Sequence, residues 1–400
     1  MEKIGRQIGV GGFRIGEKEK SNVMKVLDSG RLNYGDFSRK FEKEFSSIHG
    51  AKFGVLANSG TDALRIAIAA LKEKHSWKDG DEVLVPALTF IATSNVVIQN
   101  GLTPVFVDVE KEFYGMDPEK MEAAITPRTR AVMPVHLFGM AAQMDRIAAI
   151  AKKHSLRIVE DSCETIFAKF RGKHVGTFGD VGCFSMYAAH IIVTGVGGIA
   201  ITDDPEIAVI MRSLVNHGRD SIYLSIDDDK TDDKEKLKEI IAKRFQFVRL
   251  GFSARVTDME AAIGVAQLER KEEIITERQR NAAFLLQKLK KFEGDLQLPK
   301  VREGAEHVFM MFPIVIKSGK FTKQQVTNFL EQNNIETRDM LPLTNQPIYR
   351  KLFGADLEEK FPVAKWVNNN GFYIGCHNEM TQLELDYVVA KFEEFFSSLN

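Results

Sequence analysis

Residues 53–85 read FGVLANSGTDALRIAIAALKEKHSWKDGDEVLV, and this stretch decides the fold. Two short apolar runs, 53–57 and 82–85, flank a segment, 61–74, in which apolar residues recur with the 3.6-residue period of a helix. The pattern predicts a strand, a helix and a second strand in succession. Such units are typical of α/β proteins, because the intervening helix returns the chain so that the next strand can run parallel to the first.

The same alternation continues to about residue 202. One more helical pattern lies at 144–154, and further apolar runs predict strands at 104–107, 131–136, 156–159 and 198–201. The sequence therefore predicts an α/β fold with a largely parallel sheet. Ligands of such folds bind beyond the carboxyl ends of the strands, so we expect the functional residues in the loops that follow them.

The C-terminal part shows a different pattern. A helical pattern runs without interruption from 257 to 289 and suits a helix that bridges two domains or two subunits. A smaller α/β unit follows, with a strand near 307–316 and helices near 322–333 and 381–399. We expect a large domain over 1–255, and a bridging helix with a small domain over 256–400. Residues 225–239 are dense in charge and predict an exposed excursion.

The composition excludes several classes of protein. The 400 residues include 54 Lys and Arg against 55 Asp and Glu, a formal net charge of −1, and no basic block offers a surface for nucleic acid. No apolar run reaches the length of about eighteen residues that spans a membrane, and the N-terminal residues lack the apolar core of a signal peptide. We expect a soluble, cytoplasmic protein. The three cysteines, Cys163, Cys183 and Cys376, build neither a disulfide framework nor a four-thiolate cluster, so no metal site and no iron–sulfur cluster are expected.

Two of the loops hold residues that suit a charged ligand. In the sequence NSGT at 58–61, the free N–H groups at the start of the predicted helix suit a phosphate, although Ser59 and Thr61 could instead simply cap the helix. Asp161 ends an apolar strand, where a buried carboxylate needs a cationic partner such as a protonated ring nitrogen. Glu164 would face the same way if a helical turn begins there, and a helix cap is the alternative role for Asp161.

A third loop holds His190, just before the glycine-rich residues 194–198. An imidazole can move protons at neutral pH, and glycines let the backbone approach a ligand closely. A lone histidine is more often structural, so this loop indicates a functional site only when it is taken together with the other two loops.

These motifs and several others occur in the order and spacing typical of one family. The segments are NSGTDAL at 58–64, PALTFIAT at 86–93, PVHLFG at 134–139, EDSCE at 160–164, GDVGCFS at 179–185, AAIG at 261–264 and AQL at 266–268. Over nearly its whole length the chain resembles the sugar aminotransferase family, a branch of the fold-type I pyridoxal phosphate (PLP) enzymes that acts on nucleotide-linked keto sugars. The resemblance implies a fold-type I PLP-dependent transferase fold, with a mostly parallel seven-stranded sheet in the large domain and a smaller α/β C-terminal domain. It also implies a homodimer with each site at the subunit interface.

The resemblance further implies roles for single residues. The family's phosphate cradle falls on Gly60 and Thr61, with the hydroxyl of Ser185 as a further ligand. Its ring-stacking aromatic residue falls on Phe90. The aspartate that faces the ring nitrogen falls on Asp161, where its charge keeps the ring protonated and able to accept electrons.

The chain departs from the family pattern at several positions, three of which are expected to meet the cofactor. Glu164 stands where most relatives have glutamine, and Ser253, in GFSAR at 251–255, stands where the family has an asparagine that reaches the phosphate in the neighbouring subunit. His190 occupies the position of the lysine that holds the cofactor covalently. An imidazole has no primary amine and cannot form that bond.

Histidine at this position resembles a subgroup of 3-dehydratases that make 3,6-dideoxysugars, as in lipopolysaccharide O-antigens and the colitose pathway. It implies that His190 is catalytic and that noncovalently held pyridoxamine phosphate helps to remove the C3 hydroxyl of a nucleotide-linked 4-keto-6-deoxyhexose, with glutamate as amino donor. GDP is the expected nucleotide, and CDP is next. The alternatives are an aminotransferase and a catalytically silent relative that binds PLP or a nucleotide sugar. Candidate substrate-binding residues are His217, Arg219 and Arg338, with a structural role as the alternative for His217 and a surface or interface ion pair as the alternative for the two arginines.

Overall fold

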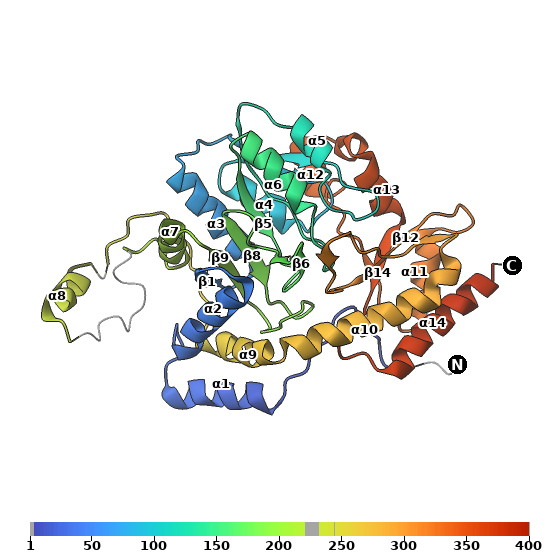
Figure 1. The fold of residues 1–400 in the computed structure, drawn as a ribbon, viewed down its shortest axis with the longest axis horizontal. Coiled ribbons are helices and arrows are strands. Elements are labelled where there is room, and N and C mark those ends of the chain that lie inside the picture. The colour runs from blue at the N-terminus through green and yellow to red at the C-terminus, as the bar shows by residue number, and fades with distance from the viewer. Residues whose placement is uncertain (1–3, 221–231, 244, 400) are drawn as a thin grey trace.

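The computed structural model describes residues 4–220, 232–243 and 245–399, and its centre is a seven-stranded sheet (Figure 1). In spatial order the strands are β1 (Phe53–Ala57), β9 (Gly198–Thr202), β8 (Val181–Ser185), β5 (Arg157–Asp161), β4 (Thr129–Val132), β2 (Glu82–Pro86) and β3 (Thr103–Val107). Strand β9 runs antiparallel to both of its neighbours, and the other neighbouring strands are parallel. The predicted α/β fold with a mostly parallel sheet is therefore confirmed.

Helices cover both faces of this sheet. Those of the N-terminal part are α1 (Glu17–Ser29), α2 (Asp36–His49), α3 (Gly60–Lys74), α4 (Ala92–Gln99), α5 (Pro118–Ala123), α6 (Met144–Lys153) and α7 (Pro205–Val215). Val83 and Val85 of β2 pack in one core with α3, α4 and α7, whereas Leu84 between them packs in another core with α2 and α6. Successive side chains of a strand point to opposite faces, so a sheet covered on both sides needs continuous apolar runs. Each fully buried valine or leucine contributes about 1.5–3 kcal/mol.

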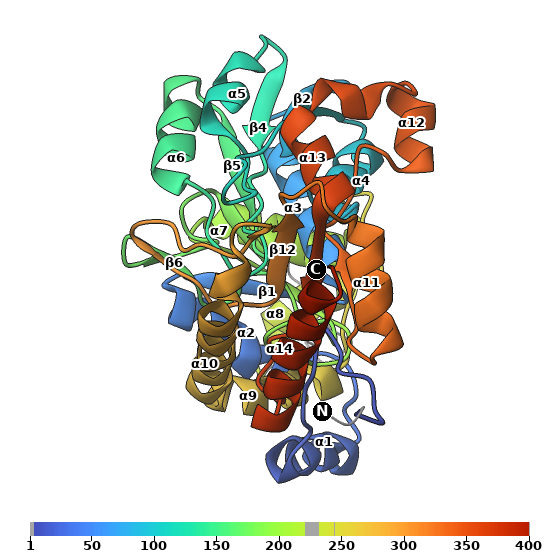
Figure 2. The same ribbon diagram turned by 90° about the vertical axis from the view of Figure 1, so that its right-hand side faces the viewer.

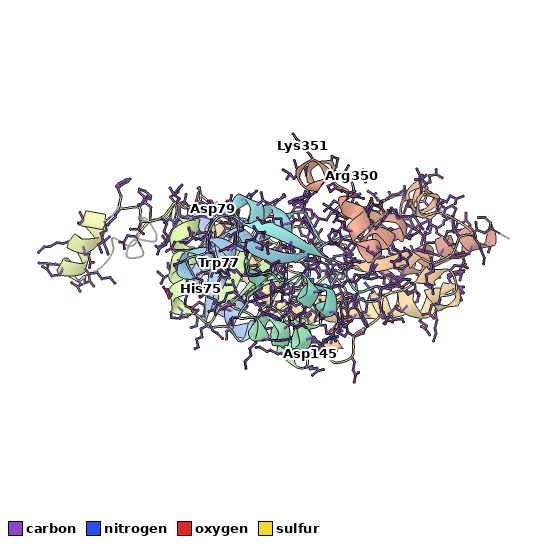
Figure 3. All side chains as sticks on the ribbon, turned by 90° about the horizontal axis from the view of Figure 1, so that it is seen from above. His75, Trp77, Asp79, Asp145, Arg350 and Lys351 are labelled. Atoms are coloured by element: carbon purple, nitrogen blue, oxygen red, sulfur yellow. The ribbon has the colours of Figure 1, made fainter. Side chains whose placement is uncertain are left out.

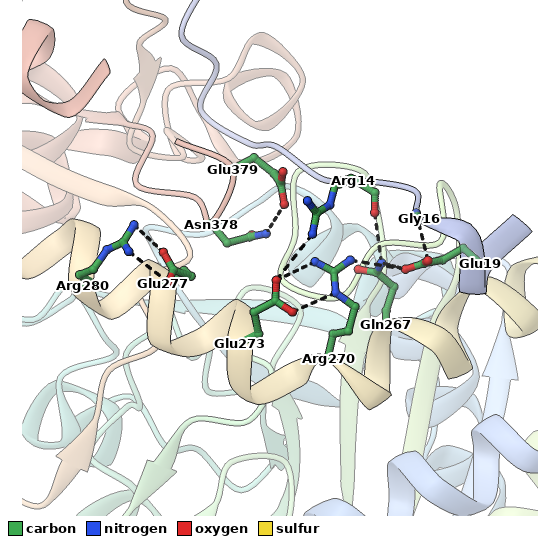
Figure 4. Close-up of polar contacts among 10 residues, drawn as sticks. All are labelled: Arg14, Gly16, Glu19, Gln267, Arg270, Glu273, Glu277, Arg280, Asn378 and Glu379. Carbon is green, nitrogen blue, oxygen red and sulfur yellow. Dashed lines mark hydrogen bonds and ion pairs between the residues drawn. The ribbon is translucent and has the colours of Figure 1, made fainter. Parts of the chain in front are cut away.

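The bridging helix is interrupted at one residue. The structure has α9 (Asp258–Glu269) and α10 (Lys271–Leu289) instead of the single helix predicted over 257–289, so that prediction was wrong at Arg270, which has φ −103° and ψ 8°. The N–H of Arg270 bonds to the carbonyl of Gln267, three residues earlier, and this tighter turn ends α9. Figure 4 shows the polar contacts at this junction, where buried Glu19 of α1 accepts a hydrogen bond of 2.6 Å from the Gln267 amide.

The C-terminal part has its own sheet, in the order β10-β12-β14-β13, and Figure 2 shows its strand β12 among the surrounding helices. Its elements are β10 (Leu296–Gln297), β12 (Phe312–Ile316), α11 (Lys323–Gln332), β13 (Arg338–Asp339), α12 (Pro347–Phe353), α13 (Pro362–Asn370), β14 (Gly371–Ile374) and α14 (Gln382–Ser397), with short 3₁₀ turns at Lys290–Phe292 and Leu357–Lys360. A third, small sheet joins β11 (Ala305–Glu306) to β6 (Lys169–Phe170) and β7 (Lys173–His174). The strand predicted near 307–316 thus begins at Phe312. The predicted domain division at 255/256 stays a prediction.

The charged excursion lies partly outside the described residues, because 221–231 are not among them. Its later part forms α8 (Lys234–Lys243), a helix that the sequence analysis did not expect. This helix stands apart from the rest of the molecule in Figure 1 and also in Figure 3, where Asp145, Arg350 and Lys351 mark the edges of the main body. Among the described residues, no helix combines the length and the apolar character that crossing a membrane requires.

Candidate active site

A cavity of about 360 Å³ lies beyond the carboxyl ends of β5 and β8, against the first turn of α3. The cavity therefore lies at the edge of the sheet where the sequence analysis placed the functional residues. The predicted site residues that line the cavity are Gly60, Thr61, Phe90, Asp161, Glu164, Ser185 and His190.

One end of the cavity suits a phosphate group. Ser59 caps α3, since its hydroxyl accepts a hydrogen bond of 3.1 Å from the N–H of Asp62, as the capping alternative required. The hydroxyl of Thr61 has no hydrogen-bond partner among the described residues, so it is free to bind a ligand. A Cβ atom on Gly60 would lie only 2.6 Å from the Cβ of Ser185, so only glycine fits there. The positive end of the helix dipole and two hydroxyls therefore converge where an anion can bind.

Asp161 is a buried carboxylate that faces the cavity. It accepts hydrogen bonds from the hydroxyl of Thr93 at 2.8 Å and from the N–H of Cys163 at 3.2 Å. No lysine or arginine forms an ion pair with it in the described part of the chain, and burial raises the pKa of its carboxyl. A cation in the cavity would stabilise the ionised carboxylate, and the protonated ring nitrogen of PLP is such a cation. The residues present therefore fit the cofactor.

Glu164 is a second carboxyl group at the cavity. Its Oε2 accepts a hydrogen bond of 3.0 Å from the N–H of Phe138. Burial raises the pKa of Glu164 to about 7, and the negative charge of Asp161 contributes to this rise. Glu164 therefore exchanges its proton near neutral pH, whereas a glutamine at this place would carry no charge at any pH.

Replacing Glu164 with glutamine should stabilise the cofactor-free protein at pH 8 by on the order of 1–2 kcal/mol and leave its stability unchanged at pH 4. The pKa of Glu164 in the folded protein lies above its value of about 4.3 in the unfolded chain. The free energy of unfolding of the natural protein therefore falls as the pH rises from about 4 to 7. The effect stays below the full linkage value because the side chain is partly open to the cavity, where solvent screens its charge.

Denaturant titrations at the two pH values measure this difference. The matched control is Glu122→Gln, because the ion pair with Lys153 lowers the pKa of Glu122. That control should lose stability slightly at pH 8. An equal effect of Glu164→Gln at both pH values would contradict the raised pKa.

His190 lies on the loop that follows β8, half-buried at the cavity wall. Its Nδ1 lies 3.1 Å from the carbonyl oxygen of Ser185, and a carbonyl can only accept. Nδ1 therefore carries the hydrogen, which leaves the lone pair on Nε2. Burial, together with the charge of Arg278, lowers the pKa of His190 to about 4 despite the hydrogen bond to Ser185. The imidazole is neutral at pH 7 and can act as a base.

No lysine lines this cavity within the part of the chain that the structure describes. A covalent bond to the carbonyl carbon of PLP needs a primary amine, which only lysine side chains supply. The site therefore offers groups to hold an aromatic phosphate and to move a proton, and offers an imidazole where the covalent anchor would stand.

The far wall of the cavity was missed by the sequence analysis. It consists of apolar and aromatic side chains from the C-terminal part, namely Met310, Met311, Leu341 and Tyr373. They lie in no recognisable motif and reach the cavity only through the tertiary fold. Tyr373 of β14 is paired in register with Arg338 of β13, which was the one nearby residue that the sequence analysis singled out.

Four predicted site residues do not line the cavity of this chain. His217 and Ser253 lie side by side, because the N–H of His217 bonds to the carbonyl of Phe252 and an isolated bridge joins Asn216 to Ser253. Arg219 lies in the same segment, over the rings of Phe245 and Phe247. Arg338 is exposed and forms an ion pair with Glu336. The ligand roles of His217, Arg219, Ser253 and Arg338 stay predictions.

Comparison with known families decides the identity of the fold. Residues 14–393 match the DegT/DnrJ/EryC1/StrS aminotransferase family. The chain belongs to this family. The predicted family and the fold-type I transferase fold are thereby confirmed.

Individual members of the DegT/DnrJ/EryC1/StrS family carry different activities. GDP-perosamine synthase of Caulobacter vibrioides is 34% identical, over 97% of this chain and 98% of that protein. The dTDP-4-dehydro-2,6-dideoxy-D-glucose 3-dehydratase of Saccharopolyspora spinosa is also 34% identical, over 96% of this chain and 85% of that protein. Membership alone therefore does not decide between transfer of an amino group and removal of a hydroxyl.

Solved structures of one dehydratase are also similar to this chain. E. coli GDP-4-keto-6-deoxy-D-mannose-3-dehydratase with bound hydrated PLP has a TM-score of 0.86 and 28% identity, over 96% of this chain and 99% of that chain. A structure of GDP-4-keto-6-deoxymannose-3-dehydratase with a trapped PLP–glutamate geminal diamine has a TM-score of 0.85 and 29% identity, over the same shares. The predicted PLP cofactor is thus confirmed at the level of the DegT/DnrJ/EryC1/StrS family.

Proposed function

We propose that this protein is a PLP-dependent 3-dehydratase, which removes the C3 hydroxyl of a nucleotide-linked 4-keto-6-deoxyhexose in 3,6-dideoxysugar biosynthesis. The observation that carries the proposal is the neutral imidazole of His190 at the wall of a cavity that no described lysine lines. A base without a primary amine can move protons but cannot compete for the cofactor's carbonyl carbon. Elimination of the hydroxyl is then the main path.

The residues divide the work of this reaction among them. When bound in its amine form, the cofactor supplies an amino group for the sugar ketone and a ring that accepts electrons. Asp161 stabilises the positive charge on the ring nitrogen, while Thr61 and Ser185 hold the phosphate. Nε2 of His190 takes a proton from the carbon that bears the cofactor's amine. The imidazolium then donates this proton to the departing C3 oxygen.

Glutamate is the proposed cosubstrate, and its role follows from the electron balance. Loss of the C3 oxygen is a two-electron reduction of the sugar. Oxidation of glutamate to 2-oxoglutarate and ammonia supplies these two electrons, so no further reductant is needed. The similar dehydratase structure with a PLP–glutamate adduct supports this choice. GDP is the proposed nucleotide, ahead of CDP.

A homodimer is part of the proposal. Large apolar side chains are exposed in the segment that also holds Ser253, with Phe245 at 81% and Leu250 at 98% exposure. Clustered exposed apolar side chains are typical of subunit contacts. We propose that this segment faces the second subunit, where His217, Arg219 and Ser253 would reach the partner's cofactor and substrate.

Glutamate-dependent turnover tests the proposed function. The purified protein, loaded with PLP, is incubated with glutamate and GDP-4-keto-6-deoxymannose, beside the CDP and dTDP sugars, and the products are identified by mass. We expect a 3-deoxy sugar and an equal amount of 2-oxoglutarate, with the GDP sugar the fastest. A 4-amino sugar as the main product would refute the dehydratase proposal.

An aminotransferase is the second candidate, favoured by the similarity to GDP-perosamine synthase. It requires a lysine outside the cavity lining to reach the cofactor. Borohydride treatment of the PLP-loaded protein, followed by peptide mass analysis, tests this requirement. A phosphopyridoxyl group on any lysine would support the aminotransferase, and no sugar product of any kind would support a silent binding protein.

A further inference from the structure

We propose that Arg278 is a positioning residue for the active site, which fixes the loop of His190 against the C-terminal wall of the cavity. Arg278 lies on the bridging helix α10 and contacts neither substrate nor cofactor in the proposed function. The inference relies on the proposed function only for the role of His190 as the base. The position and charge of His190 are measurable without any sugar substrate.

The contacts of Arg278 join three parts of the fold. Its side chain is completely buried. One terminal nitrogen donates a hydrogen bond of 2.9 Å to the carbonyl of Met310 and a longer one of 3.4 Å to that of Phe309. The other donates a bond of 3.2 Å to the carbonyl of His190. Met310 and His190 both line the cavity, so one guanidinium connects the catalytic loop to the C-terminal wall.

The charge of Arg278 is not neutralised by an acid. Its hydrogen-bond acceptors are backbone carbonyls, and no carboxylate forms an ion pair with it in the described part of the chain. Its Nε has no hydrogen-bond partner. Burial lowers the pKa of Arg278 to about 10, so it remains a cation at pH 7. Burying a charge without a counter-ion is costly, so a purely structural tie between these elements has little reason to use arginine.

The charge has a direct effect on His190. Burial is the main cause of the lowered pKa of His190, and the charge of Arg278 adds to it, because a fixed cation beside an imidazole disfavours a second proton on the ring. The other groups that face His190 are the carbonyl of Ser185 and the edge of the Tyr187 ring, while Asp161, Glu164 and Tyr373 share the cavity. The hydrogen bond to the Ser185 carbonyl favours the charged ring, and the cation of Arg278 opposes it.

Two substitutions separate charge from geometry. Arg278→Gln removes the charge and keeps some hydrogen bonding. Arg278→Lys keeps the charge but lacks the planar guanidinium whose two terminal nitrogens bond to separate carbonyls. The control is Arg280→Gln, because Arg280 lies on the same helix, is exposed, and forms a surface ion pair with Glu277 (Figure 4) besides a long hydrogen bond of 3.4 Å to the side chain of Asn281. Circular dichroism and thermal unfolding serve to check that each variant is folded.

The primary readout is the NMR titration of His190 in the PLP-loaded protein with labelled histidine, assigned by comparison with a His190→Asn sample. We expect Arg278→Gln to raise the pKa of His190 by about one unit or more and to move the acid limb of the pH–rate profile by the same amount. Arg278→Lys should keep the pKa within about 0.3 units but lower kcat roughly tenfold or more, because the base is misplaced. Arg280→Gln should match the natural protein.

An unchanged His190 titration in Arg278→Gln would overturn the charge effect. If that variant does not fold, Arg278→Lys decides alone, since a natural kcat there would overturn the positioning role. Failure of the proposed function is recognised separately. In that case the natural protein yields no 3-deoxy sugar, while the NMR titrations of the variants still support or refute the role of Arg278.

Discussion

Replacing His190 with asparagine should lower the rate of 3-deoxy sugar formation roughly 10²–10⁴-fold, the usual contribution of a positioned proton-transfer group. Nε2 of His190 carries the free lone pair at the cavity, and an asparagine amide cannot accept a proton at neutral pH. The affinity for PLP should change only a few-fold, because the phosphate and ring-nitrogen contacts belong to other residues. Single-turnover rates and PLP titrations measure the two effects separately.

A surface histidine provides the control for this experiment. His154 ends α6, pairs with Glu122 and does not line the cavity, so His154→Asn should leave the rate unchanged. A second variant, His190→Lys, should restore a primary amine at the cavity. After borohydride reduction it should carry a phosphopyridoxyl group on residue 190. A natural deoxygenation rate in His190→Asn would refute the assignment of His190 as the base.

Replacing Asp161 with asparagine should weaken PLP binding about 10²–10³-fold, since loss of one partner from a buried charge pair costs about 3–5 kcal/mol. Asparagine has nearly the same shape and can still accept a hydrogen bond, but it cannot neutralise a protonated ring nitrogen. The loss should diminish at low pH, where the natural carboxylate is itself protonated. Burial raises the pKa of Asp161. As the pH falls, the natural protein should therefore begin to lose PLP affinity at a higher pH than the ordinary pKa of an aspartate would predict.

The control for this experiment is Asp79→Asn. Asp79, labelled in Figure 3, has a side chain that is 85% exposed, forms a surface ion pair with Lys72, and does not line the cavity. The Asp79→Asn variant should bind PLP as the natural protein does. Equilibrium dialysis at pH 6 and 8 measures both variants, and equal PLP affinity of Asp161→Asn and the natural protein at pH 8 would exclude an ion pair at this residue.

Local patterns predicted those elements whose formation depends on local physics. Strand β1 and helix α3 agree with the predicted ranges 53–57 and 61–74 within a residue. A short apolar run and a 3.6-residue apolar period are both properties of the local sequence. Strand β4 lies at Thr129–Val132 instead of 131–136. Pro134 has no N–H to donate, so pairing with β5 continues beyond it only as an isolated parallel bridge between Val135 and Asp161. The break at Arg270 has no local proline or glycine, and it depends on contacts with α1 that sequence periodicity does not contain.

The site divides in the same way. Asp161, Ser185 and His190 follow strands within motifs, so loops at one edge of a parallel sheet were enough to bring them together. Tyr373 approaches the cavity from the separate C-terminal sheet and the methionines at 310–311 from the bend just before β12, and no spacing in the sequence encodes that approach. The buried cation of Arg278 was missed for a similar reason, because its acceptors are backbone carbonyls that carry no side-chain signature.

The origin of the two cavity walls has a consequence for how such proteins diversify. The charged and proton-moving groups come from residues 60–190, whereas Met310, Met311, Leu341 and Tyr373 come from the C-terminal part. Substitutions in that second wall can reshape the space available to a ligand and leave the electrostatics of Asp161 and His190 intact. A lineage with this architecture can therefore acquire new ligands through mutations in its last hundred residues while it inherits its chemistry unchanged.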